Sequence, residues 1–125
     1  MSTEAVKKVV QNYIDGTFTG NADLLATAFH NDAIMTGYLG PDLVIATPAA
    51  FVDEIRKNPS MQSQGHPYKA EITDIKVVGG VAQVVVHETG MWGEGEVEEF
   101  FQMLKDNDGT WKIISKCFTT IPPAV

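Results

Sequence analysis

Apolar side chains recur at helical spacing near the start of the chain. They fall at i, i+3, i+4, i+7 and i+8, which is one face of a helix: Val6, Val9, Val10, Tyr13 and Ile14. Ser2 or Thr3 can cap the start of this helix, because their side-chain oxygens accept from the first free N–H groups. We expect the helix to end at Gly16, since glycine readily adopts the left-handed conformation that closes helices.

Two shorter helices are expected further along. The first begins at Asn21, and its apolar side carries Leu24 and Leu25. The second begins at Thr47–Pro48, a capping residue followed by the proline that first turns favour, and extends to about Lys57.

The other segments alternate between apolar and polar residues and are separated by turn residues, which indicates strands. They are residues 32–38, 43–46, 68–78, 81–92, 97–105 and 111–120. We therefore predict an α+β fold in which three N-terminal helices pack into a strongly curved, mixed or antiparallel sheet. Residues 1–121 would form one domain, and residues 122–125 a C-terminal tail.

The charge and composition exclude several functions. The net charge is −7, with 44% hydrophobic and 20% charged residues. An acidic globular chain is a poor match for nucleic acid or for an anionic membrane surface. The first residues lack an apolar signal core, and no apolar run approaches the length that spans a membrane. We expect a cytoplasmic protein.

Two stretches resemble the NTF2-like superfamily, the cone fold shared by SnoaL and ketosteroid isomerase. "VVQNYIDGTFTGNADLLATAFHNDAIMTGY" resembles the helix-helix-strand opening of that superfamily, and "FFQMLKDNDGTWKIISKCF" resembles its last two strands. The most similar subgroup is a bacterial one described as "putative lumazine-binding", which shares the patterns "YLGxDLVxxTP" and "WKIxSKxF".

This resemblance implies a conical pocket and a homodimer formed through the outer face of the sheet. The function expected is binding of a small apolar or aromatic ligand, with no cofactor and no established catalysis. The residues expected to line the pocket are Tyr13, Phe29, Met35, Gly37, Phe51, Ile55, Trp92, Phe101, Met103 and Phe118. The alternative is an isomerase, dehydratase or cyclase that acts on a small apolar carbonyl compound.

The enzyme hypothesis requires a hydrogen-bond donor and an acid or base. Tyr13 resembles the oxyanion-hole tyrosine of ketosteroid isomerase, although it is also consistent with a core tyrosine whose hydroxyl bonds a backbone group. Gly37 aligns with the aspartate that serves as base in that enzyme. Because glycine has no proton acceptor, enolisation by the same residue cannot be carried over.

Two glutamates are the candidate acids or bases. Period two puts Glu99 on one strand face with Phe101 and Met103, where it would be a carboxyl in an apolar pocket with a raised pKa. The more economical interpretation is a solvated residue at the mouth of the sheet, within an acidic run. Glu88 shares its face with apolar residues and would point inward, while His87 would face the opposite side.

His30 and Asp32 are also candidates, at the junction between a helix and a strand. A catalytic dyad is one interpretation, but the favoured one is a turn in which Asp32 bonds nearby backbone N–H groups. The histidines lack the spacing of metal ligands, so no metal is expected. Cys117 is expected to be a small buried hydrophobic residue rather than a nucleophile.

Overall fold

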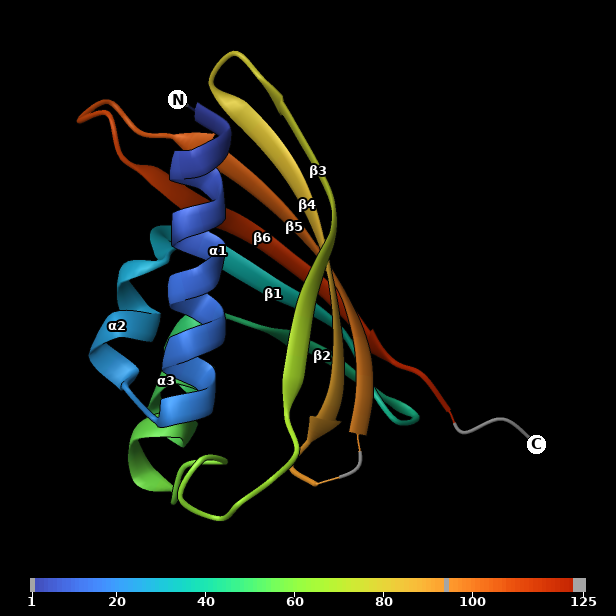
Figure 1. The fold of residues 1–125 in the computed structure, drawn as a ribbon. Coiled ribbons are helices and arrows are strands. Elements are labelled where there is room, and N and C mark those ends of the chain that lie inside the picture. Colours follow the sequence, from blue (N-terminus) through green and yellow to red (C-terminus); the bar gives the residue numbers. More distant parts are fainter. Residues whose placement is uncertain (1, 94, 123–125) are drawn as a thin grey trace.

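The computed structural model describes residues 2–93 and 95–122, and it contains helices and strands in the predicted order (Figure 1). The helices are α1 (Ser2–Thr19), α2 (Ala22–Thr27) and α3 (Pro48–Lys57). The strands are β1 (Phe29–Leu39), β2 (Asp42–Ala46), β3 (Lys69–Val78), β4 (Val81–Met91), β5 (Gly95–Lys105) and β6 (Trp111–Thr120). Of the predicted tail, Pro122 is irregular and residues 123–125 lie outside the described residues.

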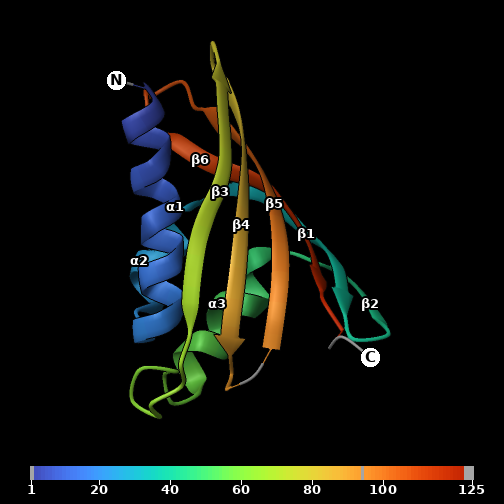
Figure 2. The same cartoon turned by 45° about the vertical axis from the view of Figure 1, so that its right-hand side comes forward.

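The strands form one sheet in the order β2-β1-β6-β5-β4-β3. Neighbouring strands are antiparallel except β1 and β6, which run parallel. The helices lie on one face of the sheet, and the sheet curves so that α3 lies on its concave side (Figures 1 and 2). The predicted α+β architecture, with three helices against a curved mixed sheet, is therefore confirmed.

The first helix is longer than predicted. It passes through Gly16 and ends at Thr19, before Gly20, whose φ of +78° is the left-handed conformation expected of a closing glycine. Gly16 serves a different purpose, because a Cβ there would lie 2.8 Å from the backbone nitrogen of Leu25. Its missing side chain lets α1 and α2 approach closely. Ser2 and Thr3 lie inside the helix.

The starts of the other helices agree with prediction. The side chain of Asn21 accepts a hydrogen bond from the Leu24 backbone N–H at 3.1 Å and caps α2. Thr47 occupies the N-cap position of α3 in an extended conformation, with Pro48 as the first helical residue, although the Thr47 side chain makes no capping bond. Within the described residues, no helix has both the length and the apolarity needed to cross a membrane.

The inner face of the sheet supplies most of the core. Alternate residues of β4 and β5 are buried, as their period-two pattern predicted: Ala82, Val84, Val86 and Glu88 in β4, and Glu99, Phe101 and Met103 in β5. A second, smaller cluster consists of Met35, Val97 and Phe118, and Phe51 and Met91 pack against both clusters. This second cluster forms a wall of the cavity described next.

Candidate functional site

A cavity of about 580 Å³ opens between α3, the β1–β2 hairpin and the inner face of β5 and β6. Five of the ten residues predicted to line a pocket do line this cavity: Met35, Phe51, Ile55, Trp92 and Phe118. Most of the other lining residues are also apolar, including Val44, Ala46, Ala50, Met91 and Val97. The volume lies within the range of small-molecule sites in proteins.

The other five predicted lining residues lie elsewhere. Tyr13, Phe101 and Met103 are almost fully buried in the main core. The Phe29 ring packs edge-on against Tyr13 with their centroids 6.0 Å apart, and Phe29 borders a separate surface depression on the other side of α3. None of these four residues forms the surface of the cavity.

Gly37 has a structural role instead of a place in the cavity wall. A Cβ at this position would lie 1.9 Å from the backbone oxygen of Phe118, its partner across the parallel β1–β6 pair. The φ of Gly37 is +155°, which side chains rarely tolerate. The glycine therefore permits close approach of two strands, and the absence of its side chain does not enlarge the cavity.

An ion pair closes the inner end of the cavity. The ammonium Nζ of Lys116 lies 2.9 Å from Oε2 of Glu99, and both residues line the cavity although each is less than 5% exposed. The Tyr13 hydroxyl donates to both carboxylate oxygens, at 2.8 Å to Oε1 and 3.0 Å to Oε2. The interpretation of Glu99 as a solvated residue is wrong, because its strand face turns into the cone.

Aromatic rings surround the Lys116 ammonium. Nζ lies 4.3 Å from the ring centroid of Phe51, 5.0 Å from that of Tyr13 and 5.1 Å from that of Phe118. The negative faces of such rings attract a cation, so they help to hold a charged amine that is almost removed from water. Lys116 is thus stabilised by Glu99 on one side and by ring faces on others.

Lys116 was missed by sequence reasoning because strand β6 contains a bulge. Ser115 pairs with Gln102 and Ile113 pairs with Met103, so Ile114 is an extra residue in β6. Strict alternation from Trp111 would have turned Lys116 outward, but the bulge turns it inward. The same shift leaves Cys117 exposed, so the prediction that it is buried is wrong.

The hydroxyl of Tyr13 does not face the cavity. It is committed to the Glu99 carboxylate rather than to a backbone group, so the interpretation as a core tyrosine bonded to backbone is also wrong. Burial raises the pKa of Tyr13 well above its ordinary value, and the negative charge of Glu99 raises it further. Tyr13 therefore positions Glu99 and does not itself present a donor to the cavity.

Glu88 is fully buried behind the cavity and does not line it. The Tyr68 hydroxyl donates to its Oε2, while Oε1 has no hydrogen-bond partner within the described residues. Burial, and then the charge of Glu99, raise the pKa of Glu88 to about 10. Glu88 therefore keeps its proton to a much higher pH than an exposed glutamate does.

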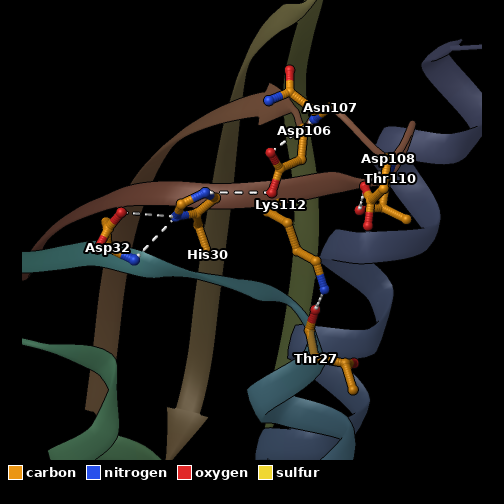
Figure 3. A network of polar contacts seen from close by, with 8 residues as sticks. All are labelled: Thr27, His30, Asp32, Asp106, Asn107, Asp108, Thr110 and Lys112. Atoms are coloured by element: carbon orange, nitrogen blue, oxygen red, sulfur yellow. Dashed lines mark hydrogen bonds and ion pairs between the residues drawn. The ribbon is translucent and has the colours of Figure 1, made fainter.

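His30 and Asp32 lie at the start of β1, facing the turn between β5 and β6 (Figure 3). Nδ1 of His30 accepts a hydrogen bond from the Asp32 backbone N–H at 3.0 Å, and Nε2 lies 3.4 Å from Asp106. Because Nδ1 is an acceptor here, it carries no proton for the Asp32 carboxylate to hold, and a catalytic dyad is not formed. The cavity is lined by neither residue.

The predicted turn at His30–Asp32 is also different in detail. Strand β1 already begins at Phe29, and the pairing with β6 is irregular between Phe29 and Ile34. Residues His30 to Asp32 thus belong to an irregular part of strand β1. The Asp32 backbone N–H bonds the His30 ring, and not the Asp32 carboxylate. His87 faces outward as expected, with its Nε2 2.9 Å from Glu96.

The chain matches one protein family and is similar to several solved structures. Residues 1–119 match the family described as "Putative lumazine-binding". An NTF2-like protein of unknown function from Methylobacillus flagellatus is 26% identical, with a TM-score of 0.85 over 97% of this chain and 93% of the other. A second, from Shewanella baltica, is 24% identical, with a TM-score of 0.82 over 98% of this chain and 95% of the other.

A more distant structure shares the fold alone. A ketosteroid isomerase-like protein from Erwinia carotovora is 15% identical, with a TM-score of 0.64 and 96% of each chain covered. No curated protein matches the chain.

Proposed function

Because the chain belongs to the family described as "Putative lumazine-binding", within the NTF2-like superfamily, we propose that it binds a small apolar or aromatic molecule in the cavity beneath α3. The observation that carries the proposal is the shape and chemistry of this cavity. Its walls are largely apolar, and its inner end presents one carboxylate and one ammonium. Ligand sites in proteins typically combine an apolar lining with a few fixed polar groups in this way.

The position of the polar groups also supports binding. Exposed polar side chains of Glu54, Asn58 and Gln64 lie at the rim, and the Glu99–Lys116 pair lies at the buried end. A bound molecule would place its apolar body against Phe51, Phe118 and neighbouring side chains. Burial of apolar surface would supply most of the binding free energy, and the inner pair would set the orientation.

Acid–base catalysis on a small apolar carbonyl compound is a second candidate, of the isomerase, dehydratase or cyclase type. The observation that favours it is that Glu99, a carboxylate removed from water, lies in the cavity wall. The form of this hypothesis that uses Tyr13 as the donor and Glu88 as the acid or base has less support, because neither side chain reaches the cavity. Lys116 would be the donor instead.

Ligand binding is tested with a variant that blocks the cavity. Ala50 is an exposed residue of α3 that lines the cavity, and Ala49, the next residue, faces the separate depression instead. We expect Ala50→Trp to abolish the thermal stabilisation produced by binding ligands, and the matched control Ala49→Trp to retain it. The ligands would be a panel of flavins, pterins, steroids and polyketide-like ketones.

The panel separates the possible outcomes. A ligand that stabilises wild type and Ala49→Trp but not Ala50→Trp supports the proposal. Equal stabilisation of both variants would place binding outside the cavity, and no stabilisation by any ligand class would contradict the proposal.

We also propose that the protein is a homodimer formed through the outer face of the sheet. Large apolar side chains are exposed there, including Ile34, Tyr38 and Phe100, each about half exposed. Phe100 pairs with Cys117 across β5 and β6, near the centre of the sheet. Exposed apolar patches on a sheet face are typical of an interface. Light scattering at micromolar concentration would give the mass of a dimer, and a monomer mass would refute this.

A further inference from the structure

Lys116 brings a primary amine to the apolar cavity. Among the described residues that line the cavity, it is the only lysine. Its side chain is buried, and its Nζ lies 4.3 Å from the ring centroid of Phe51 and 5.1 Å from that of Phe118. A lysine amine in a hydrophobic pocket is a group that proteins use as a nucleophile towards carbonyl compounds.

Three side chains are arranged as a nucleophile, a base and a group that orients the base. Oε2 of Glu99 lies 2.9 Å from Nζ of Lys116, which is within reach of a direct proton transfer. The Tyr13 hydroxyl gives its single proton to the same carboxylate and fixes the orientation of that group. When the ammonium passes a proton to Glu99, both buried groups become neutral, and a site almost without water favours this transfer more than bulk water does.

From this geometry we propose that Lys116 forms an imine with an apolar aldehyde or ketone bound in the cavity. Nζ gives one proton to Glu99, and its lone pair then forms a bond to the carbonyl carbon. The carbonyl oxygen receives the π electrons and takes a second proton from the nitrogen, which gives a carbinolamine. Glu99 returns its proton to the new hydroxyl, the C–O bond breaks, and water leaves.

The product is a protonated imine beside the Glu99 carboxylate, and the step needs no oxidant or reductant. This inference rests on the proposed function, because the same cavity must hold the carbonyl compound.

The surroundings of Nζ stabilise the product as they stabilise the ammonium. The protonated imine carries one positive charge at the same place, so Glu99 still faces a cation. The rings of Tyr13, Phe51 and Phe118 remain close to that charge. Because Lys116 and Glu99 are almost fully buried, water that would hydrolyse the imine is largely excluded. The reaction therefore adds no unpaired charge to the inner end of the cavity.

Reductive trapping tests for the imine on the wild-type protein. The probe is 6-methoxy-2-naphthaldehyde, and sodium cyanoborohydride converts any protonated imine into a stable secondary amine. Mass spectrometry of peptides then measures the rate of labelling at each lysine. We expect Lys116 to be labelled at least about tenfold faster than the exposed Lys76 and Lys105, because the cavity holds the aldehyde beside Nζ.

Cavity variants and a competitor locate the reaction. Ala50→Trp should abolish the labelling of Lys116 by filling the cavity, and the matched control Ala49→Trp should retain it. The competitor is 6-methoxy-2-naphthalenemethanol, which keeps the two rings and lacks the carbonyl. An excess of this alcohol should slow the labelling of Lys116 and leave that of Lys76 unchanged, and it gives the answer on wild-type protein if Ala50→Trp does not fold.

The outcomes distinguish this inference from the function on which it rests. Reversible binding of both probes in the cavity, with Lys116 labelled no faster than Lys76, would overturn the imine and leave ligand binding intact. Fast labelling of Lys116 that the alcohol does not slow would place the reaction outside the cavity and would also overturn the inference. Binding of neither probe would count against both the inference and the proposed function.

Discussion

The Glu99–Lys116 pair is expected to be strongly coupled in the free energy of unfolding. Its two charges are 2.9 Å apart. With an effective dielectric constant of about 20, Coulomb's law gives an attraction of about 6 kcal/mol, before the cost of removing the charges from water. Removing one partner leaves the other charge buried and unpaired, which costs about 3–5 kcal/mol.

A double-mutant cycle measures this coupling. Wild type, Lys116→Met, Glu99→Gln and the double variant are each unfolded in urea at pH 7. We expect each single variant to lose about 3 kcal/mol, and the double variant to lose clearly less than the sum of the two, because it buries no unpaired charge. The coupling energy should be about 2 kcal/mol or more. Additive losses, with a coupling energy below about 0.5 kcal/mol, would refute the buried pair.

Three further predictions concern Glu88, Gly37 and the outer face of the sheet. The pKa of Glu88 is raised to about 10 in the folded protein, so between its ordinary value and about 10 the folded chain keeps a proton that the unfolded chain has lost. The free energy of unfolding is therefore highest at low pH and falls as the pH rises towards 10. Glu88→Gln should therefore gain stability relative to wild type between pH 5 and pH 9 in urea unfolding, and a constant difference would contradict the raised pKa. Gly37→Ala should cost about 3 kcal/mol because of its collision with the Phe118 backbone, whereas Gly79→Ala, which has a positive φ of 55° in open space, should cost about 1 kcal/mol. Equal losses for the two glycine variants would refute the close strand approach. Phe100→Glu should give a monomer in light scattering at a concentration where wild type is a dimer, and an unchanged dimer mass would place the interface elsewhere.

The regular parts of the fold could be predicted because their signals are local. The period-two pattern in β4 predicted that Glu88 points inward, where it is buried. In β5 the pattern grouped Glu99 with Phe101 and Met103 but did not decide which face of the strand is buried. The capping residue Thr47 and the following Pro48 predicted the exact residue at which α3 begins. In each case the burial pattern or the backbone chemistry of a few neighbouring residues decides the structure.

The features that sequence reasoning missed depend on contacts between distant segments. Gly16 appeared to end α1, but its role is to let Leu25 of α2 approach. Lys116 faces the cavity because of one extra residue in β6, and period-two reasoning does not predict where a bulge falls. Tyr13 was placed correctly in the helix, but only the fold shows that its hydroxyl bonds Glu99, which is 86 positions away in the chain.

Chemical shifts of methionine methyl groups test ligand binding in the cavity most directly. Met35 and Met91 line the cavity, whereas Met103 is buried in the main core away from it. Protein labelled with ¹³C at these methyl groups would be titrated with 6-methoxy-2-naphthalenemethanol. We predict that the signals of Met35 and Met91 shift to saturation while the signal of Met103 moves much less. Shifts confined to Met103, or no shift of Met35 and Met91 at saturating probe, would contradict binding in this cavity.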